Sequence, residues 1–184
     1  FANNNFFGLY GALAMDLASN PVLTDLTFSN NGFNGMDLFG DTLTSNASWD
    51  DPGVVYRPPA NLTVPSGVTL TVVPGQVIKF PGGGSAVGSL IVNGTLQAPG
   101  TAAKPVVFTS TRDDTFGGDS NNDGPTSELF RGVWGGIEFA PGSTVYQSLD
   151  IALASLSETT NVLELEIDYR YPRYRQRNQA YNWL

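Results

Sequence analysis

The sequence predicts an all-β fold of the solenoid type, in which short strands coil and stack on the strands of the next turn. A short phrase recurs in it, an apolar triplet followed by a turn that contains glycine. The apolar stretches are rich in β-branched residues, and 21 glycines and 12 prolines supply turn residues. Copies at residues 70–75 and 90–94 begin 20 residues apart. Such a period is typical of repeat folds, whose turns cover each other's faces.

Composition and charge exclude several kinds of chemistry. The chain has no cysteine and no histidine, so it can build no disulfide, no Ser-His-Asp or Cys-His nucleophile and no His- or Cys-ligated zinc site. The net charge of −8 argues against general nucleic-acid binding. No apolar run is long enough to span a bilayer. Because the chain starts without Met, we expect a processed N-terminus or a piece of a longer protein.

Residues 1–43 are predicted to form the first rungs of the solenoid. The hexads 1–6 and 28–33 both place small residues and paired asparagines between two phenylalanines. Asparagine tolerates the left-handed backbone conformation at a turn, and the phenylalanines would stack inward. Residues 9–18 carry leucines at a spacing of four, but their glycines and the strand-like residues 22–24 favour a rung over a helix.

A linker or module boundary is predicted at 44–60, where Asp-Asp-Pro-Gly and Arg-Pro-Pro indicate turns and extended chain rather than packed structure. The second module, 61–147, contains most of the predicted strands. Turns rich in proline and glycine separate them, as suits the corners of a solenoid. The strands are expected at 62–64, 68–73, 77–80, 90–92, 95–97, 106–109 and 133–139.

Two segments depart from the repeat. Residues 110–131 are polar, glycine-rich and acidic, and we expect them to project as a loop from one corner, where repeat proteins usually place functional groups. Residues 148–184 are predicted to form a C-terminal strand and arm. Within them, 163–170 alternate apolar and charged side chains, as in a strand with one face in water.

Part of the second module resembles a known family. The sequences LTVPSGVTLTV at 62–72 and PGQVIKF at 74–80 resemble the opening of a right-handed parallel β-helix module of bacterial secreted and cell-surface proteins, which is similar to the pectin-lyase-like β-helices. Residues 90–96, 100–110 and 134–137 continue the resemblance, which covers about 54–145. It implies a right-handed parallel β-helix and a secreted or cell-surface location. It implies no particular activity, since such modules mostly occur as pieces of large adhesin-like proteins.

The acidic loop contains a candidate calcium site. Asp119, Asn121 and Asp123, followed by Gly124, fit D-x-[DN]-x-[DN]-G, the first half of an EF-hand-like calcium loop. The oxygen ligands alternate along the chain, and the glycine permits the sharp turn that brings them onto one ion. The twelfth position should be Glu but is Phe130.

Other carboxylates near this motif could complete the site. We expect Asp113, Asp114 and Glu128 to join the bound Ca²⁺, which would order a loop whose charges otherwise repel one another. The alternative is a solvated acidic turn that holds no ion.

The same loop is also a candidate catalytic site. Asp113 and Asp114 form a carboxylate pair of the kind that polysaccharide hydrolases use as acid and as base or nucleophile. A lyase would need a basic residue such as Arg112 or Arg131. The sequence does not pair these groups, and the histidine common in the hydrolase relatives is absent. We therefore predict no catalytic residue and no enzymatic activity.

The C-terminal arm is the candidate partner-binding site. Residues 1–168 hold 17 acidic and 5 basic side chains, a net charge of −12, whereas residues 169–184 hold four arginines and no acid. Basic and aromatic side chains that interleave can bind single-stranded nucleic acid or an acidic glycan, but on an acidic chain docking on an acidic neighbour is favoured. The predicted binding residues are Arg170, Tyr171, Arg173, Tyr174, Arg175 and Arg177.

Together these features predict a structural protein of a bacterial surface or filament. Solenoid ends expose unpaired backbone groups, so we expect end-to-end self-association or contact with neighbouring modules of a larger adhesin. The alternative function is a calcium-dependent module that binds or degrades carbohydrate.

Overall fold

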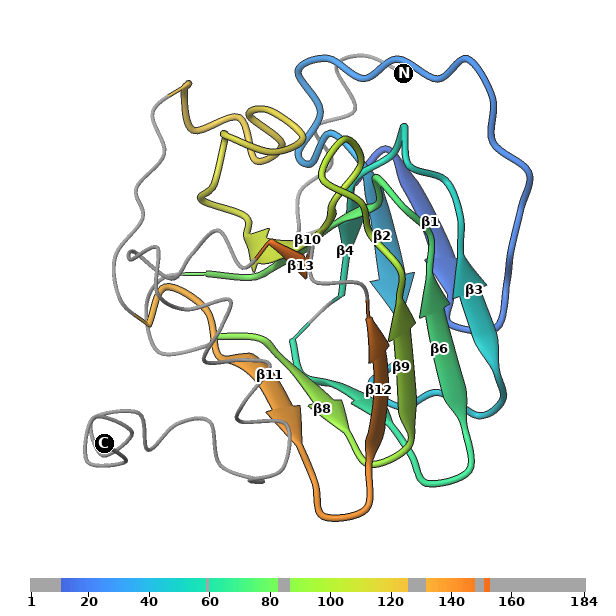
Figure 1. Cartoon of the computed structure of the whole chain (residues 1–184). Helices are drawn as coiled ribbons and strands as arrows, with labels where there is room; N and C mark the ends of the chain where they lie inside the picture. The colour runs from blue at the N-terminus through green and yellow to red at the C-terminus, as the bar shows by residue number, and fades with distance from the viewer. Residues whose placement is uncertain (1–10, 59, 83–86, 126–131, 148–150, 153–184) are drawn as a thin grey trace.

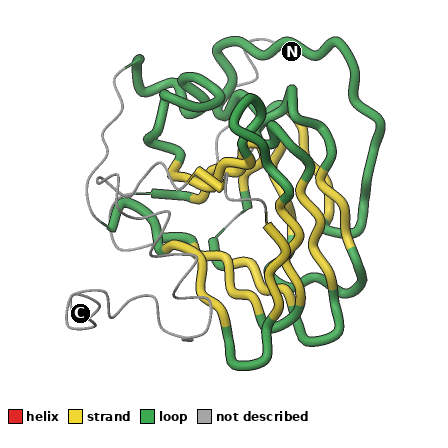
Figure 2. The backbone as a smooth tube through the Cα atoms, in the orientation of Figure 1, coloured by secondary structure: helices red, strands yellow, loops and turns green. Residues whose placement is uncertain are grey.

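The computed structural model describes residues 11–58, 60–82, 87–125, 132–147 and 151–152. Among these residues all regular elements are β-strands and none is a helix (Figure 2), which confirms the all-β prediction. The strands are β1 (Leu13–Asp16), β2 (Met36–Phe39), β3 (Ala47–Trp49), β4 (Tyr56–Arg57), β5 (Leu62–Val64), β6 (Thr69–Val72), β7 (Val77–Phe80), β8 (Ser89–Val92), β9 (Thr95–Ala98), β10 (Val106–Ser110), β11 (Gly136–Phe139), β12 (Thr144–Gln147) and β13 (Ile151–Ala152).

The strands form three parallel sheets (Figure 1). The six-stranded sheet has the order β1-β2-β4-β7-β10-β13, the four-stranded sheet β12-β9-β6-β3 and the three-stranded sheet β11-β8-β5. From β3 onward the chain visits the four-, six- and three-stranded sheets in the same cyclic order. Each of these strands therefore pairs with the strand one circuit before or after it, rather than with its neighbour in sequence.

The register corrects the predicted period. Leu70 pairs with Leu96, 26 residues later, and Leu90 pairs with Leu62, 28 residues earlier. Leu70 and Leu90 themselves lie in different sheets. Because one circuit contains three strands and three corners, the same phrase occurs more than once per circuit. The 20-residue offset thus joins two strands of similar sequence in different sheets, not two stacked strands.

The core lies between the three sheets and is built by alternation along each strand. In β6 the side chains of Leu70 and Val72 are fully buried, whereas Thr69 and Thr71 on the other face are half-buried. Parallel pairing stacks like on like, for example Leu62 on Leu90. Burying one such aliphatic side chain contributes about 1.5–3 kcal/mol, so the stacked apolar rows supply most of the stability of the fold.

The described residues of the segment 44–60 are packed, so the expectation of unpacked structure is wrong for them. The segment contains β3, which pairs with β6, and β4, which pairs with β2 and β7. Trp49 and Tyr56 are fully buried with their ring centroids 5.8 Å apart. The turn at Asp51 is a corner, closed by a hydrogen bond from the Val54 amide to the Asp51 carbonyl at 2.9 Å. The division of the chain into modules at this point stays a prediction.

The corners follow the turn residues. The predicted glycines at 67, 75 and 142 all have positive φ, a conformation that glycine adopts without a steric cost. Gly94 is needed for a different reason, because a Cβ there would lie 2.2 Å from the Pro65 carbonyl oxygen. Residues 13–16 form a strand, as favoured over a helix. The hexad 1–6 and the predicted C-terminal strand lie outside the described residues.

Candidate metal centre

The outward face of the six-stranded sheet carries a row of polar side chains. Register pairs Asp37 of β2 with Arg57 of β4, and Lys79 of β7 with Thr109 of β10. Because Tyr56 pairs with Ile78, Arg57 and Lys79, which follow them, lie at the same level. An outward row would normally meet solvent, yet Lys79 and Thr109 are fully buried and Asp37 is nearly so. Two loop segments cover this face: the segment before β2, which includes Phe33, and the loop after β10.

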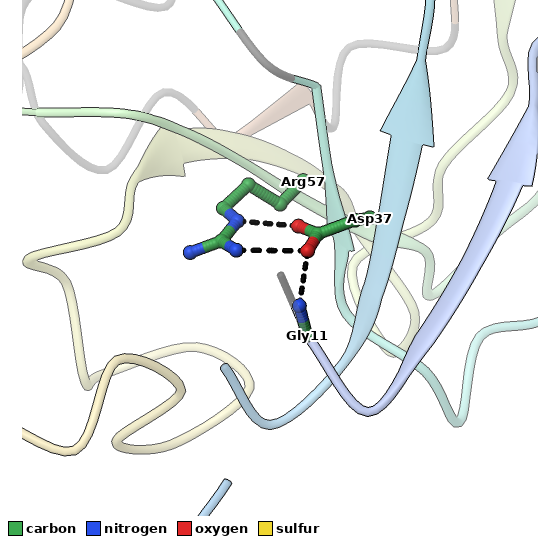
Figure 3. A network of polar contacts seen from close by, with 3 residues as sticks. All are labelled: Gly11, Asp37 and Arg57. Atoms are coloured by element: carbon green, nitrogen blue, oxygen red, sulfur yellow. Dashed lines mark hydrogen bonds and ion pairs between the residues drawn. The ribbon is translucent and has the colours of Figure 1, made fainter. Parts of the chain in front are cut away.

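One end of the row is a charge pair. Arg57 donates from Nε to Asp37 Oδ1 at 2.6 Å and from Nη2 to Oδ2 at 2.9 Å, and the Gly11 amide also donates to Oδ2 (Figure 3). The Arg57 guanidinium carbon lies 4.0 Å from the centroid of the buried Phe33 ring. Two parallel hydrogen bonds and a stacked ring hold the guanidinium in one orientation.

Lys79 occupies the middle of the row. Its Nζ donates a hydrogen bond of 2.6 Å to the carbonyl of Gly118. Burial lowers the pKa of Lys79 to about 8, and the negative charges of Asp113, Asp114, Asp119 and Asp123 act in the opposite direction. The lysine is therefore the buried cation beneath the acidic loop.

The loop after β10 folds back over this lysine, so the prediction that it projects is wrong for the residues described. Gly117 and Gly118 both have positive φ and turn the backbone toward the sheet. A Cβ on Gly117 would lie 2.5 Å from Val55 Cγ2, so the close approach also requires glycine. The hydrogen bond from Lys79 to the Gly118 carbonyl then holds the loop at this point.

The Asp113 carboxylate forms hydrogen bonds with residues close to it in sequence. The side chain is fully buried; it accepts a hydrogen bond from Thr109 Oγ1 at 2.7 Å and one from the Thr115 amide at 3.0 Å. Each carboxylate oxygen thus has a donor. The geometry fits a structural anchor better than a freely available metal ligand or catalytic acid.

Asp114, Asp119 and Asp123 come together. One carboxylate oxygen from each lies within 4.8 Å of the other two. Burial raises the pKa of Asp114, with the negative charge of Asp119 as the next cause. The Gly124 amide donates to Asp119 Oδ2 at 3.1 Å, which closes the turn that the glycine of the motif was expected to make.

Two oxygens of this group are buried without a hydrogen-bond donor. They are Oδ1 of Asp119 and Oδ1 of Asn121. The Asn121 amide nitrogen donates to Asp123 Oδ2 at 2.7 Å, so the amide oxygen has no partner among the described residues. A buried acceptor that lacks a donor costs free energy, and a cation is one group that would satisfy it.

The donor set fits calcium. All of the candidate ligands are carboxylate or amide oxygens, which hard cations prefer. Calcium accepts oxygens at 2.3–2.6 Å in flexible geometry, so ligands on opposite sides of the ion are roughly 5 Å apart. The three carboxylate oxygens lie within 4.8 Å of one another, so one ion could contact all three.

The other side of the loop contacts the segment before β2 (Figure 1). The Asn34 amide donates to the Ser120 carbonyl at 2.7 Å. Asn34 Nδ2 donates to Asn122 Oδ1 at 3.0 Å and to the Asp119 carbonyl at 3.3 Å, and Asn122 Nδ2 donates to the Asn31 carbonyl. The loop is therefore fastened both to the sheet and to the N-terminal part of the chain.

The structure thus unites part of the predicted site. It places Asp114, Asp119, Asn121 and Asp123 in one loop, while Asp113 has separate partners. Glu128 lies outside the described residues, as do the partner-binding residues Arg170, Tyr171, Arg173, Tyr174, Arg175 and Arg177.

Sequence reasoning missed Lys79 and Asn34. Lys79 interrupts an apolar strand, and alternation places it on the outward face, where a lysine is expected in water. Its burial depends on the loop after β10, which begins 32 residues later, at Thr111. Asn34 follows the predicted hexad at 28–33, but nothing in the sequence connects it to a segment 85 residues away.

Comparison with known proteins adds no relative. No protein-family model matches the chain, and searches of curated proteins and of solved structures also find no match. The resemblance to pectin-lyase-like β-helices therefore stays a prediction. Within the part of the chain that the structure describes, there is no helix long and apolar enough to cross a membrane.

Proposed function

We propose that this protein is a structural β-helix module of the right-handed parallel type and that its acidic loop binds a calcium ion. The observation that carries the proposal is the convergence of Asp114, Asp119 and Asp123 with buried oxygens that lack donors. The expected setting is a secreted or cell-surface protein. The ion would neutralise the mutual repulsion of the carboxylates and hold the loop on the sheet.

The cyclic order of the strands supports a structural role. A chain that passes through three parallel sheets in turn places each circuit on the previous one and buries a continuous apolar core. Such an assembly resists local opening, because each strand has neighbours on both sides except at the sheet edges. A rigid scaffold is what a surface module or filament subunit needs.

Calorimetric titration of the metal-free protein with Ca²⁺ tests the calcium site. We expect binding with a measurable heat, and a higher melting temperature in Ca²⁺ than in a chelator, since a ligand that binds the native state stabilises it. The variant Asp119→Asn should weaken Ca²⁺ binding by at least about 10-fold. Loss of a residue that only supports a metal ligand commonly lowers metal affinity by about 10-fold or more, and Asp119→Asn removes the charge of a ligand itself.

Asp41→Asn is the matched control, since it makes the same change of charge at an exposed residue elsewhere in the chain. It should bind Ca²⁺ like the wild type. A wild-type protein that gives no heat and no shift in melting temperature on addition of Ca²⁺ would contradict the calcium site. Equal weakening by both variants would point to a general charge effect instead.

We also propose that the module associates with a second copy or with a neighbouring module. The strands β1 and β3 are the outer strands of their sheets among the described residues, and unpaired strand edges favour the addition of another strand. Val22 and Phe39 expose apolar surface, with 92% and 45% of their area accessible. Sedimentation over a wide concentration range tests this; a monomer at every concentration would oppose self-association.

A further inference from the structure

The metal-binding loop has two sides that alternate along the sequence. Asp119, Asn121 and Asp123 supply the oxygens of the candidate centre. The contacts to the segment before β2 come from Ser120 and Asn122, which lie between them, and from the backbone carbonyl of Asp119. Neighbouring residues of one short loop therefore serve either the candidate metal centre or the contact with the segment before β2. Because they share one backbone, a shift of the contact residues also moves the metal ligands.

Asn34 is the centre of the second contact. Its backbone amide binds the Ser120 carbonyl, and its side-chain amide binds the Asp119 carbonyl and Asn122 Oδ1. Asn34 thus donates to three residues of the loop, which lie on both sides of Asn121. These bonds restrict the backbone at the same positions from which the metal ligands extend.

Asn34 is itself held firmly. Its Oδ1 accepts hydrogen bonds from the Asn31 amide at 3.2 Å and from Asn31 Nδ2 at 3.0 Å. Asn31 and Phe33 are buried, and a Cβ on Gly35 would lie 2.4 Å from the Val55 carbonyl oxygen. The segment is therefore packed closely against the residue that precedes β4, so that it offers the loop a rigid support.

We propose that Asn34 is a positioning residue for the metal centre, which sets the backbone of 119–122 so that the carboxylates converge. This inference rests on the proposed calcium site. Supporting residues behind metal ligands commonly change metal affinity 10- to 100-fold. Because coupling between two sites is reciprocal, a bound ion also stabilises the contact between the loop and residues 31–34.

Calorimetry with Ca²⁺ and hydrogen exchange test the inference together. In Asn34→Ala the dissociation constant for Ca²⁺ should rise about 10-fold. In the wild type, Ca²⁺ should slow amide exchange at 31–36 as well as at 119–124. In Asn34→Ala the slowing at 31–36 should be lost, a readout that a merely stabilising residue would not affect.

Two further variants serve as controls. Asn46→Ala removes a bond of similar type, in which Asn46 Oδ1 accepts from the Thr69 amide at 2.9 Å at another corner; it should leave calcium affinity unchanged. Asn122→Gly removes the partner side chain while keeping a residue that tolerates positive φ, which Asn122 has. It should weaken Ca²⁺ binding as Asn34→Ala does, and it replaces that variant if Asn34→Ala does not fold.

The outcomes separate this inference from the proposed function. If the wild type binds Ca²⁺ and both loop-contact variants bind it equally well, Asn34 does not position the centre and this inference fails alone. If the wild type binds no Ca²⁺, the proposed calcium site fails and this inference fails with it. If Asn46→Ala weakens binding as much as Asn34→Ala, the effect is general destabilisation and the inference is overturned.

Discussion

The two faces of the six-stranded sheet are both buried, but different forces hold them. The inward row Met36, Tyr56, Ile78 and Phe108 packs into the apolar core. The outward row, one residue later in each strand, is Asp37, Arg57, Lys79 and Thr109. Apolar packing is non-directional and contains no charged group that a proton or a counterion could bind, whereas the outward row depends on particular donors, acceptors and charges.

The difference teaches where this protein can respond to its surroundings. The inward row fixes the stacking of the strands and has no titratable group near neutral pH, since burial and the hydrogen bond to Asp51 raise the pKa of Tyr56 well above its usual value. The outward row and its covering loop contain the lysine and the carboxylates that an ion or a proton can affect. The inward face of the sheet thus supplies rigidity, and the outward face of the same sheet carries the groups that can respond to protons or ions.

The largest expected effect comes from breaking the inward row. Ile78 is fully buried between Tyr56 and Phe108, and Ile78→Ala should lower the free energy of unfolding by about 2–5 kcal/mol, because it leaves a cavity in a close-packed core. Denaturant titration measures this. The loss should be the same in low and high salt and with or without Ca²⁺; a strong salt dependence would contradict the view that apolar packing holds Ile78 in this row.

A smaller loss is expected from the charged end of the outward row. In Asp37→Asn the Arg57 guanidinium keeps its place beside Phe33 but loses its charged partner. We expect a loss of about 1.5–3 kcal/mol, typical of hydrogen bonds to charged groups. Denaturant titration at several salt concentrations should show a gap between variant and wild type that narrows as salt rises. A loss in free energy of unfolding no larger than that of the exposed control Asp41→Asn would contradict a stabilising role for the Asp37–Arg57 pair.

The smallest effect is a pH dependence from Lys79. Its pKa is about 8 in the folded protein and 10.5 as a reference, so as pH rises through 8 the folded state releases a proton that the unfolded state still holds. Stability therefore increases with pH in this window. In the metal-free protein we expect a gain of about 1–2 kcal/mol between roughly pH 7.5 and 9.5.

Lys79→Met should abolish this gain, while the exposed-lysine control Lys104→Met should keep it. Denaturant titrations across the pH range measure both. The carboxylates that face Lys79 are Asp113, Asp114, Asp119 and Asp123. A gain that persists in Lys79→Met would show that another group is responsible.

Much of the fold could be predicted from local pattern. The strands β5 and β7 have the predicted bounds, since alternation of β-branched and polar residues between turn signals specifies a strand with one inward face. The period could not be predicted in the same way. Phrases in all three sheets look alike, so only the pairing of Leu70 with Leu96 tells which copies stack.

The candidate site was predictable to the extent that it is local. Asp119, Asn121 and Asp123 lie within five residues, and their alternation is visible in the sequence. The anchoring of Asp113 by Thr109 could not be predicted, because Thr109 looks like any residue of a strand. The docking of the loop on Asn34 could not be predicted either, since a hydrogen bond between segments 85 residues apart leaves no local pattern.

The sequence by itself determined that this chain is built from short strands and tight turns, and that one acidic loop has the oxygen spacing of a calcium ligand set. These properties depend on backbone preference and on side chains a few residues apart. The tertiary structure alone decided that the loop lies on the sheet, that Lys79 is buried beneath it and that Asn34 supports it. The physical reason is that burial of a charge and convergence of distant hydrogen bonds arise only when separate circuits of the chain pack together.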